Sequence, residues 1–134
     1  MSVAIIVDVD GFEPIFALLD RLENPDWNQL LRVMGMTIEE QTINHFTQQA
    51  GPSGSWPPTA RGGPALIKTG TLRGSIQTVV GVDQVEVGTN IQYGKYHQFG
   101  TKTLPQRAFL GLTNSDQDEL QDVIEGYVER LLGE

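Results

Sequence analysis

The stretch GPSGSWPPTARGGPALIKTGTLRGSI (residues 51–76) and, after a short β-like segment, VGTNIQYGKYHQFGTKTLPQRAFLGL (87–112) say most about this chain. Glycine, proline and single aromatic residues stand there at irregular intervals, together with six of the nine basic residues. No reaction requires this set of residue types, whereas a chain that must hold an irregular, partner-facing shape does. We therefore interpret residues 51–111 as a surface for assembly.

Length and composition limit the possible classes of protein. The chain has 134 residues, 39% of them hydrophobic, which is enough for one domain with a buried core but too little for two. We therefore expect a single domain over residues 1–134. The absence of cysteine excludes disulfides and thiolate metal sites. No signal peptide pattern and no long apolar run occur, so we expect a soluble protein made in the cytoplasm.

The charge is distributed unevenly along the chain. The net charge is -6 over residues 1–50, +4 over 51–113 and -6 over 114–134, which gives the total of -8. An acidic chain is a poor nonspecific binder of nucleic acid, because neutralising phosphates requires clustered Lys and Arg. A basic middle between acidic ends favours head-to-tail association of like subunits. The alternative is that the acidic helices only keep the protein soluble.

Apolar spacing predicts the elements that precede the Gly/Pro-rich segment. Residues 2–9 alternate like a strand, and residues 12–22 have helical spacing. A longer helix is expected to begin after Asp26 and to end near residue 50. Residues 51–65 hold four prolines and four glycines, so they predict a loop that is mobile or is ordered by a partner.

The second half of the chain predicts a hairpin, a helical turn, a strand and a final helix. The expected bounds are 75–82 and 84–89 for the hairpin, 93–99 for the turn and 108–112 for the strand, with Asn114 or Ser115 capping the final helix. Helices and hairpins are segregated rather than alternating, which predicts an α+β fold. We expect a small, mostly antiparallel sheet packed on the long helix, with a C-terminal helix and a long Gly/Pro-rich loop.

The strand-like VAIIVDVDG (3–11) is the only pattern that suggests an enzyme. A strand followed by Asp8, Asp10 and Gly11 is similar to the motif by which haloacid-dehalogenase-like phosphatases present a nucleophilic aspartate and a general acid. The chain has neither the length nor the βα repeats that such an enzyme needs. We therefore interpret Asp8 and Asp10 as the residues that end a strand and form a turn.

Other catalytic and metal-binding patterns are missing from the sequence. The two histidines, His45 and His97, have no carboxylate or second histidine at ligand spacing. We expect His45 to be solvated on the polar side of the long helix and His97 to be a hydrogen-bonded structural residue. Neither a GxSxG elbow nor a GxxxxGK[ST] phosphate loop occurs. We predict no catalytic residue, no cofactor and no metal.

Residues for a contact with another protein can be named instead. Trp56 stands before two prolines without an obvious core to enter, and exposed aromatic residues are typical interface hot spots. The alternative is that Trp56 folds back on its own domain. The predicted interface consists of Trp56, Arg61, Lys68, Arg73, Lys95 and Lys102.

The order of the motifs resembles a known family. GPSGSWPP (51–58), LIKTGTLRGSI (66–76), VGTN (87–90), YGKYHQFGT (93–101) and PQRAFLGL (105–112) follow one another as in the phage virion morphogenesis family, the tail completion proteins of tailed phages and prophages. The resemblance implies a non-enzymatic structural protein that completes the tail or joins it to the head, as a ring or docked on one. It also implies like subunits and tail or connector proteins as partners, assembly in the host cytoplasm, and residence in the virion.

On this resemblance, we expect a small structural wedge where the chain doubles back. Its predicted members are Tyr93, Tyr96, His97 and Phe99, with Arg107 and Phe109 beside them. We also expect Leu72, Ile76 and Val80 to hold the hairpin on the long helix. Three alternatives stay open: a minor capsid or tail component, a nucleic-acid-binding module that uses the basic segment 61–107, and a small hydrolase that uses Asp8 and Asp10.

Overall fold

The computed structural model describes residues 1–8, 27–60, 62–66, 70–82 and 84–133. The helix expected over residues 12–22 and the turn at Asp10 lie outside these residues. So do Asp26, the expected cap of the long helix, and two predicted interface residues, Arg61 and Lys68.

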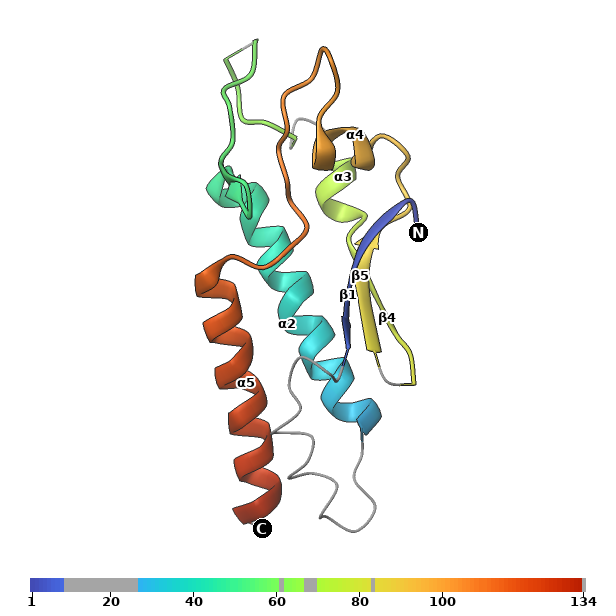
Figure 1. Ribbon diagram of the computed structural model, residues 1–134, viewed down its shortest axis with the longest axis vertical. Coiled ribbons are helices and arrows are strands. Elements are labelled where there is room, and N and C mark those ends of the chain that lie inside the picture. The colour runs from blue at the N-terminus through green and yellow to red at the C-terminus, as the bar shows by residue number, and fades with distance from the viewer. Residues whose placement is uncertain (9–26, 61, 67–69, 83, 134) are drawn as a thin grey trace.

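Two long helices and a small sheet form the body of the protein. The elements are β1 Val3–Asp8, α2 Trp27–Gln48, β2 Ala50–Gly51, β3 Gly54–Ser55, α3 Thr71–Gly74, β4 Gln77–Val80, β5 Gln84–Thr89, α4 Gly94–Phe99 and α5 Asn114–Gly133. Figure 1 shows α2 in the middle, with the sheet on one side of it and α5 on the other. The predicted α+β architecture, with a long helix, a small antiparallel sheet and a C-terminal helix, is confirmed.

The main sheet has three antiparallel strands in the order β1-β5-β4. The central strand β5 pairs with β1 from Val3↔Thr89 onward and with β4 from Gln77↔Gly88 onward. Because side chains alternate between the faces of a strand, Val85 and Val87 lie on one face of β5, and both are fully buried. The predicted strand and hairpin at these positions are confirmed.

The helix α2 packs closely on this sheet at Gly35. A Cβ atom at this position would lie 2.4 Å from Thr78 Cγ2 on β4, so only glycine lets the two elements approach this far. Thr78 Oγ1 in turn donates to Glu39 Oε2 over 2.6 Å. Leu72 and Ile76 are buried in the core cluster and Val80 packs against it, so the hairpin does lie against the long helix as expected.

Buried apolar side chains from both long helices form a continuous cluster with the sheet. On α2 the spacing of three and four residues that predicted a helix places four side chains in this cluster with no exposed surface: Leu30, Leu31, Met34 and Ile38. From α5, Leu120, Ile124 and Val128 enter the same cluster. Each such side chain contributes about 1.5–3 kcal/mol when fully buried, so this interface supplies much of the stability.

Residues 108–112 form no strand, so this prediction was wrong. Their backbone groups bond instead to one side chain, that of Gln98 on α4. Gln98 Oε1 accepts from the N–H groups of Phe109 and Leu110, both over 3.0 Å, and Gln98 Nε2 donates to Leu110 O over 2.9 Å. A side-chain amide thus satisfies backbone groups that a neighbouring strand would otherwise have to pair.

The cap of α5 is also not one of the two residues that the sequence suggested. Thr113 Oγ1 accepts from Asp116 N over 3.0 Å, and Asp116 Oδ2 accepts from Thr113 N over 3.1 Å. This reciprocal pair is a capping box, with aspartate in the place usually taken by glutamate.

Within the part of the chain that the structure describes, no helix has the length and apolar character needed to cross a membrane.

Candidate interaction surfaces and the buried polar network

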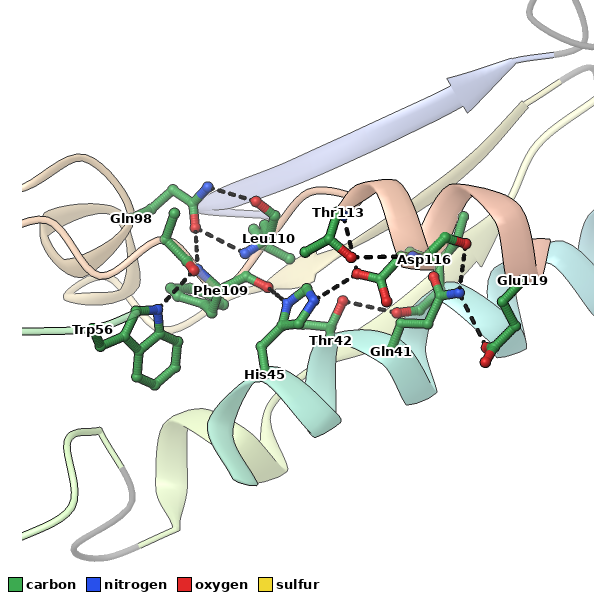
Figure 2. A network of polar contacts seen from close by, with 12 residues as sticks. Gln41, Thr42, His45, Trp56, Gln98, Phe109, Leu110, Thr113, Asp116 and Glu119 are labelled. Carbon is green, nitrogen blue, oxygen red and sulfur yellow. Dashed lines mark hydrogen bonds and ion pairs between the residues drawn. The ribbon is translucent and has the colours of Figure 1, made fainter. Parts of the chain in front are cut away.

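His45 on α2 lies at the centre of a buried polar network (Figure 2). Its side chain is 2% exposed, its Nδ1 lies 2.7 Å from Phe109 O, and its Nε2 lies 2.7 Å from Asp116 Oδ2. The prediction of a solvated His45 was wrong, because α5 and the segment before it cover this side of α2. One imidazole ring therefore joins three segments that are distant in the sequence.

Both partners of His45 accept hydrogen bonds. A backbone carbonyl has no proton to give, and an ionised carboxylate has none either. The imidazole ring lies between these two acceptors, so it joins the backbone at Phe109 to the carboxylate in the first turn of α5.

Gln41 extends this network along the same side of α2. Its Nε2 donates to Asp116 O over 2.9 Å and to Glu119 Oε1 over 3.1 Å, while its side chain is 3% exposed. The first turn of α5 is thus held to α2 by two polar side chains, Gln41 and His45, as well as by apolar packing.

Trp56 is buried within its own chain. It is 7% exposed, its Nε1 donates to Ala108 O over 3.0 Å, and its ring lies edge-on to that of Phe46 at 5.6 Å. The expectation that Trp56 has no core to enter was wrong, and the alternative, in which it folds back on its own domain, is confirmed. Gly51 permits this arrangement, because a Cβ there would lie 2.1 Å from Ala108 O.

Arg107 binds the same loop at Pro57 and Pro58, the two residues that follow Trp56. Its Nε donates to Pro57 O and its Nη2 to Pro58 O, each over 3.0 Å, and its side chain is 6% exposed. Gln49 holds the far side of the loop through two bonds with the backbone of Ala65. The described part of the predicted loop is therefore attached to its own chain, whereas the sequence suggested that a partner would order it.

The predicted wedge is divided between the surface and the core. Phe109 is fully buried and packs on Phe46 with 5.3 Å between the ring centroids. In contrast, the exposed fractions of Tyr93, Tyr96 and Phe99 are 42%, 47% and 68%, so these three side chains are not packed in the core, although the Tyr93 ring lies edge-on to that of His97 at 6.0 Å. The inward side of α4 carries Gly94, which is buried, and Gln98, which bonds to the backbone. Since positions four residues apart lie on the same side of a helix, Gly94 and Gln98 define the inward side of α4, and Tyr93, Tyr96 and Phe99 are exposed.

These outward aromatic residues form part of an exposed surface at one end of the molecule. We call it the aromatic–basic surface, and it consists of Tyr93, Lys95, Tyr96, Phe99, Lys102 and Leu104. Lys95 Nζ lies 5.4 Å from the centre of the Tyr96 ring, which is within the range of a cation–π contact. Lys95 and Lys102 are exposed, as an interface requires, whereas Arg73 on α3 is half-buried.

A pocket of about 570 Å³ opens beside this surface. Loop residues 58–60 and 103–105 line it together with Leu66, His97 and Arg107. Burial lowers the pKa of His97 below its ordinary 6.5, and the positive charge of Arg107 lowers it further. His97 Nδ1 is buried and has no hydrogen-bond partner, so the predicted hydrogen-bonded histidine is only partly matched; its backbone carbonyl accepts from Arg107 N over 2.8 Å.

Several residues that hold these surfaces in place were not predicted from the sequence. The Thr-x-x-Asp pattern at 113–116 was a detectable signal for the capping box, but nothing local to His45 or Gln98 indicated their partners.

Among the described residues, no three His, Asp or Glu side chains gather as metal ligands would.

Comparison with known proteins agrees with this picture. The sequence model of the phage virion morphogenesis family matches residues 7–129. The chain is also similar to the Mu-like prophage FluMu G protein 2 of Haemophilus influenzae (strain ATCC 51907 / DSM 11121 / KW20 / Rd), with 28% identity over 136 aligned positions that cover 94% of this chain and 97% of the relative. No solved structure matches. The family match covers most of the chain, so the protein belongs to the phage virion morphogenesis family.

Proposed function

We propose that this protein is a non-catalytic structural subunit that completes the phage tail or joins the tail to the head. It acts as a ring or as a subunit docked on one, is made in the host cytoplasm and stays in the virion. Its membership of the phage virion morphogenesis family supports a role in building the particle. The aromatic–basic surface supports the more specific proposal that the protein completes the tail or joins it to the head.

The aromatic–basic surface has the composition of a contact site between proteins. Tyr96 and Phe99 are 47% and 68% exposed, and Leu104 beside them is 38% exposed. Aromatic side chains dominate the binding energy of protein interfaces, and clustered exposed apolar groups favour burial against a partner. An assembly subunit keeps such a surface uncovered until its partner is in place.

The charges of the chain favour a like subunit as one partner. Residues 87–115 contain three bases and no acid, whereas the exposed side of α5 carries five acids: Asp118, Glu119, Asp122, Glu125 and Glu129. Figure 1 shows α4 near one end of the long axis, while α5 runs toward the other end. A head-to-tail contact between copies brings these opposite charges together, which favours fast and correctly oriented association. Tail and connector proteins are the other proposed partners.

Sedimentation of the purified protein tests this proposal. We expect the protein to self-associate, or to co-sediment with tails assembled without it. The double variant Tyr96→Ala/Phe99→Ala is expected to lose this association while keeping its fold. Val82→Ala is the matched control, because Val82 is 94% exposed but lies at the turn of the hairpin between β4 and β5. A wild-type protein that neither self-associates nor binds such tails contradicts the proposal.

The nucleic-acid alternative makes a different prediction for the same surface. Exposed aromatic rings beside lysines can stack on bases and contact phosphates. Binding of this kind weakens steeply as salt increases, because phosphate contacts release counterions. Fluorescence anisotropy with single-stranded and duplex DNA at increasing salt therefore distinguishes the alternatives. Tight binding with a steep salt dependence would favour the DNA-binding module over the assembly surface.

A further inference from the structure

Arg107 is a buried cation that has no anionic partner among the described residues. Its side chain is 6% exposed, and its two hydrogen bonds go to the carbonyl groups of Pro57 and Pro58, which carry no net charge. In the ranges for which side chains are described, the one ion pair joins His45 to Asp116, and no carboxylate reaches Arg107. Burying an unpaired charge is costly, so a guanidinium in this state favours an anion close by.

The pocket beside Arg107 gives an anion access to it. A volume of about 570 Å³ is within the usual size range of ligand pockets and is sufficient for two or three amino-acid side chains. A guanidinium has five N–H groups, and those not donating to the two proline carbonyls remain available to a ligand. Leu66, Leu104 and Pro105 make part of the described lining apolar, and Thr59 and Thr103 add hydroxyl groups to it beside the cation Arg107.

His97 adds a second polar group to the pocket. Its ring is part of the lining, and its Nδ1 is buried without a hydrogen-bond partner. Buried polar atoms in proteins almost always have a partner, so the orphan Nδ1 is an unusual feature of a residue that lines this pocket. Burial lowers the pKa of His97 below 6.5 and the positive charge of Arg107 lowers it further, so at neutral pH the ring adds a polar but uncharged group to the lining.

We propose that this pocket, the Arg107 pocket, binds a carboxylate on an acidic peptide segment of a partner protein. Arg107 supplies the counter-charge, and an apolar residue next to the acid packs on Leu66 and Leu104, with the His97 ring beside it in the lining. This inference goes beyond the proposed function, because it identifies the chemical group that the pocket recognises. It holds whether or not the protein forms a ring.

A peptide carboxylate fits the pocket better than a nucleic-acid phosphate. Binding along a nucleic-acid backbone requires several cations in a row, and the described lining of this pocket offers one, Arg107, in a chain whose net charge is -8. The apolar part of the lining, which includes Leu66, Leu104 and Pro105, matches an apolar side chain of a peptide but not the polar backbone of DNA. DNA binding is therefore an outcome that the experiment must be able to detect.

Nuclear magnetic resonance of the full-length protein tests the proposal with two peptides that differ only in charge. The probes are N-acetyl-leucyl-glutamate amide and its glutamine counterpart, with a short DNA duplex as a third probe. We expect the glutamate peptide to shift the resonances of the His97 ring and Arg107 Nε, and to bind roughly tenfold more tightly than the glutamine peptide. Equal binding of the two peptides, no shift up to the solubility limit, or displacement of the peptide by DNA would overturn the proposal.

A charge placed at the rim of the pocket provides the genetic test. Arg107→Gln also removes the bonds to the loop and risks misfolding, so Leu104→Glu is the main variant. Leu104 is 38% exposed and lines the pocket, and a carboxylate there competes with the ligand for Arg107. We expect Leu104→Glu to lose at least tenfold in affinity for the glutamate peptide. Val82→Glu, which makes the same charge change at a remote exposed site, is expected to bind as the wild type does. Unchanged binding by Leu104→Glu would contradict the assignment.

Discussion

His45 on α2 and Asp116 in the first turn of α5 meet over 2.7 Å inside the protein, although 71 positions separate them in the sequence. The carboxylate that His45 contacts is also the one that accepts from Thr113 N at the start of α5. The same imidazole contacts Phe109 O, so it fixes the helix start and the preceding segment relative to α2. This arrangement determines where residues 107–113, which include Arg107, lie on the long helix.

Removing the His45 ring is expected to destabilise the protein. His45→Ala leaves Phe109 O and Asp116 without their donor and opens a cavity, so we expect a loss of about 2–3 kcal/mol in the free energy of unfolding. Urea denaturation measures this quantity, and a double-mutant cycle with Asp116→Asn isolates the pair. Asp118→Asn, an exposed change in the same helix, is the control and is expected to cost less than about 0.5 kcal/mol. A His45→Ala cost equal to that of the control would show that the network does not stabilise the fold.

The capping box gives a second prediction. Thr113→Ala removes the hydroxyl that accepts from Asp116 N, so we expect a loss of about 1 kcal/mol in the free energy of unfolding. Asn114→Ala changes the next residue, which is exposed and which the sequence alone suggested as the cap, and it is expected to be nearly neutral. Thermal or urea denaturation measures the loss of stability in both variants. A larger loss for Asn114→Ala than for Thr113→Ala would place the cap at Asn114.

Two phenylalanines that the sequence placed in one wedge are expected to behave differently. Phe109 is fully buried, so Phe109→Ala should cost about 3–5 kcal/mol in the free energy of unfolding. Phe99 is 68% exposed, so Phe99→Ala should cost less than about 0.5 kcal/mol. Denaturant titration compares them directly. A loss of several kcal/mol for Phe99→Ala would restore the original expectation of a packed wedge.

The lowered pKa of His97 predicts a pH dependence of stability. Because its pKa is below 6.5 in the folded protein, the unfolded chain takes up this proton at a higher pH than the folded chain does. The free energy of unfolding therefore decreases as the pH falls through 6.5, and this contribution is fully lost below the folded pKa. We expect His97→Gln to remove this part of the slope when stability is measured by denaturation between neutral and mildly acidic pH. A wild type and a variant with parallel profiles would contradict the prediction.

The sequence predicted those parts of the fold that depend on local spacing. The apolar period of Leu30, Met34 and Ile38 indicated α2, and the alternation around Val85 and Val87 indicated a half-buried strand. The helical turn expected over residues 93–99 is α4, and Gly100 follows it with a φ of 78°, a conformation that favours glycine. These signals depend only on residues a few positions apart.

The interaction surfaces depend on contacts that no local pattern encodes. Gln98 satisfies the backbone of Phe109 and Leu110, which removed the expected strand, and nothing near Gln98 in the sequence indicates this. Trp56 finds its acceptor at Ala108, 52 positions away, so its burial was one of two equally open alternatives. The aromatic side of α4 is exposed because Gly94 and Gln98 take the inward positions. Only the packed structure shows which residues of α4 face inward.

We propose that the aromatic–basic surface acts in building the virion, and counting complete particles tests this role. A phage or prophage that lacks this protein is complemented with the wild type, Tyr96→Ala/Phe99→Ala, or the control Val82→Ala, and complete tailed particles are counted by electron microscopy. We predict wild-type numbers with Val82→Ala, and free heads and unjoined tails with the double variant, although both variants fold. Wild-type numbers of complete particles with Tyr96→Ala/Phe99→Ala would contradict the account.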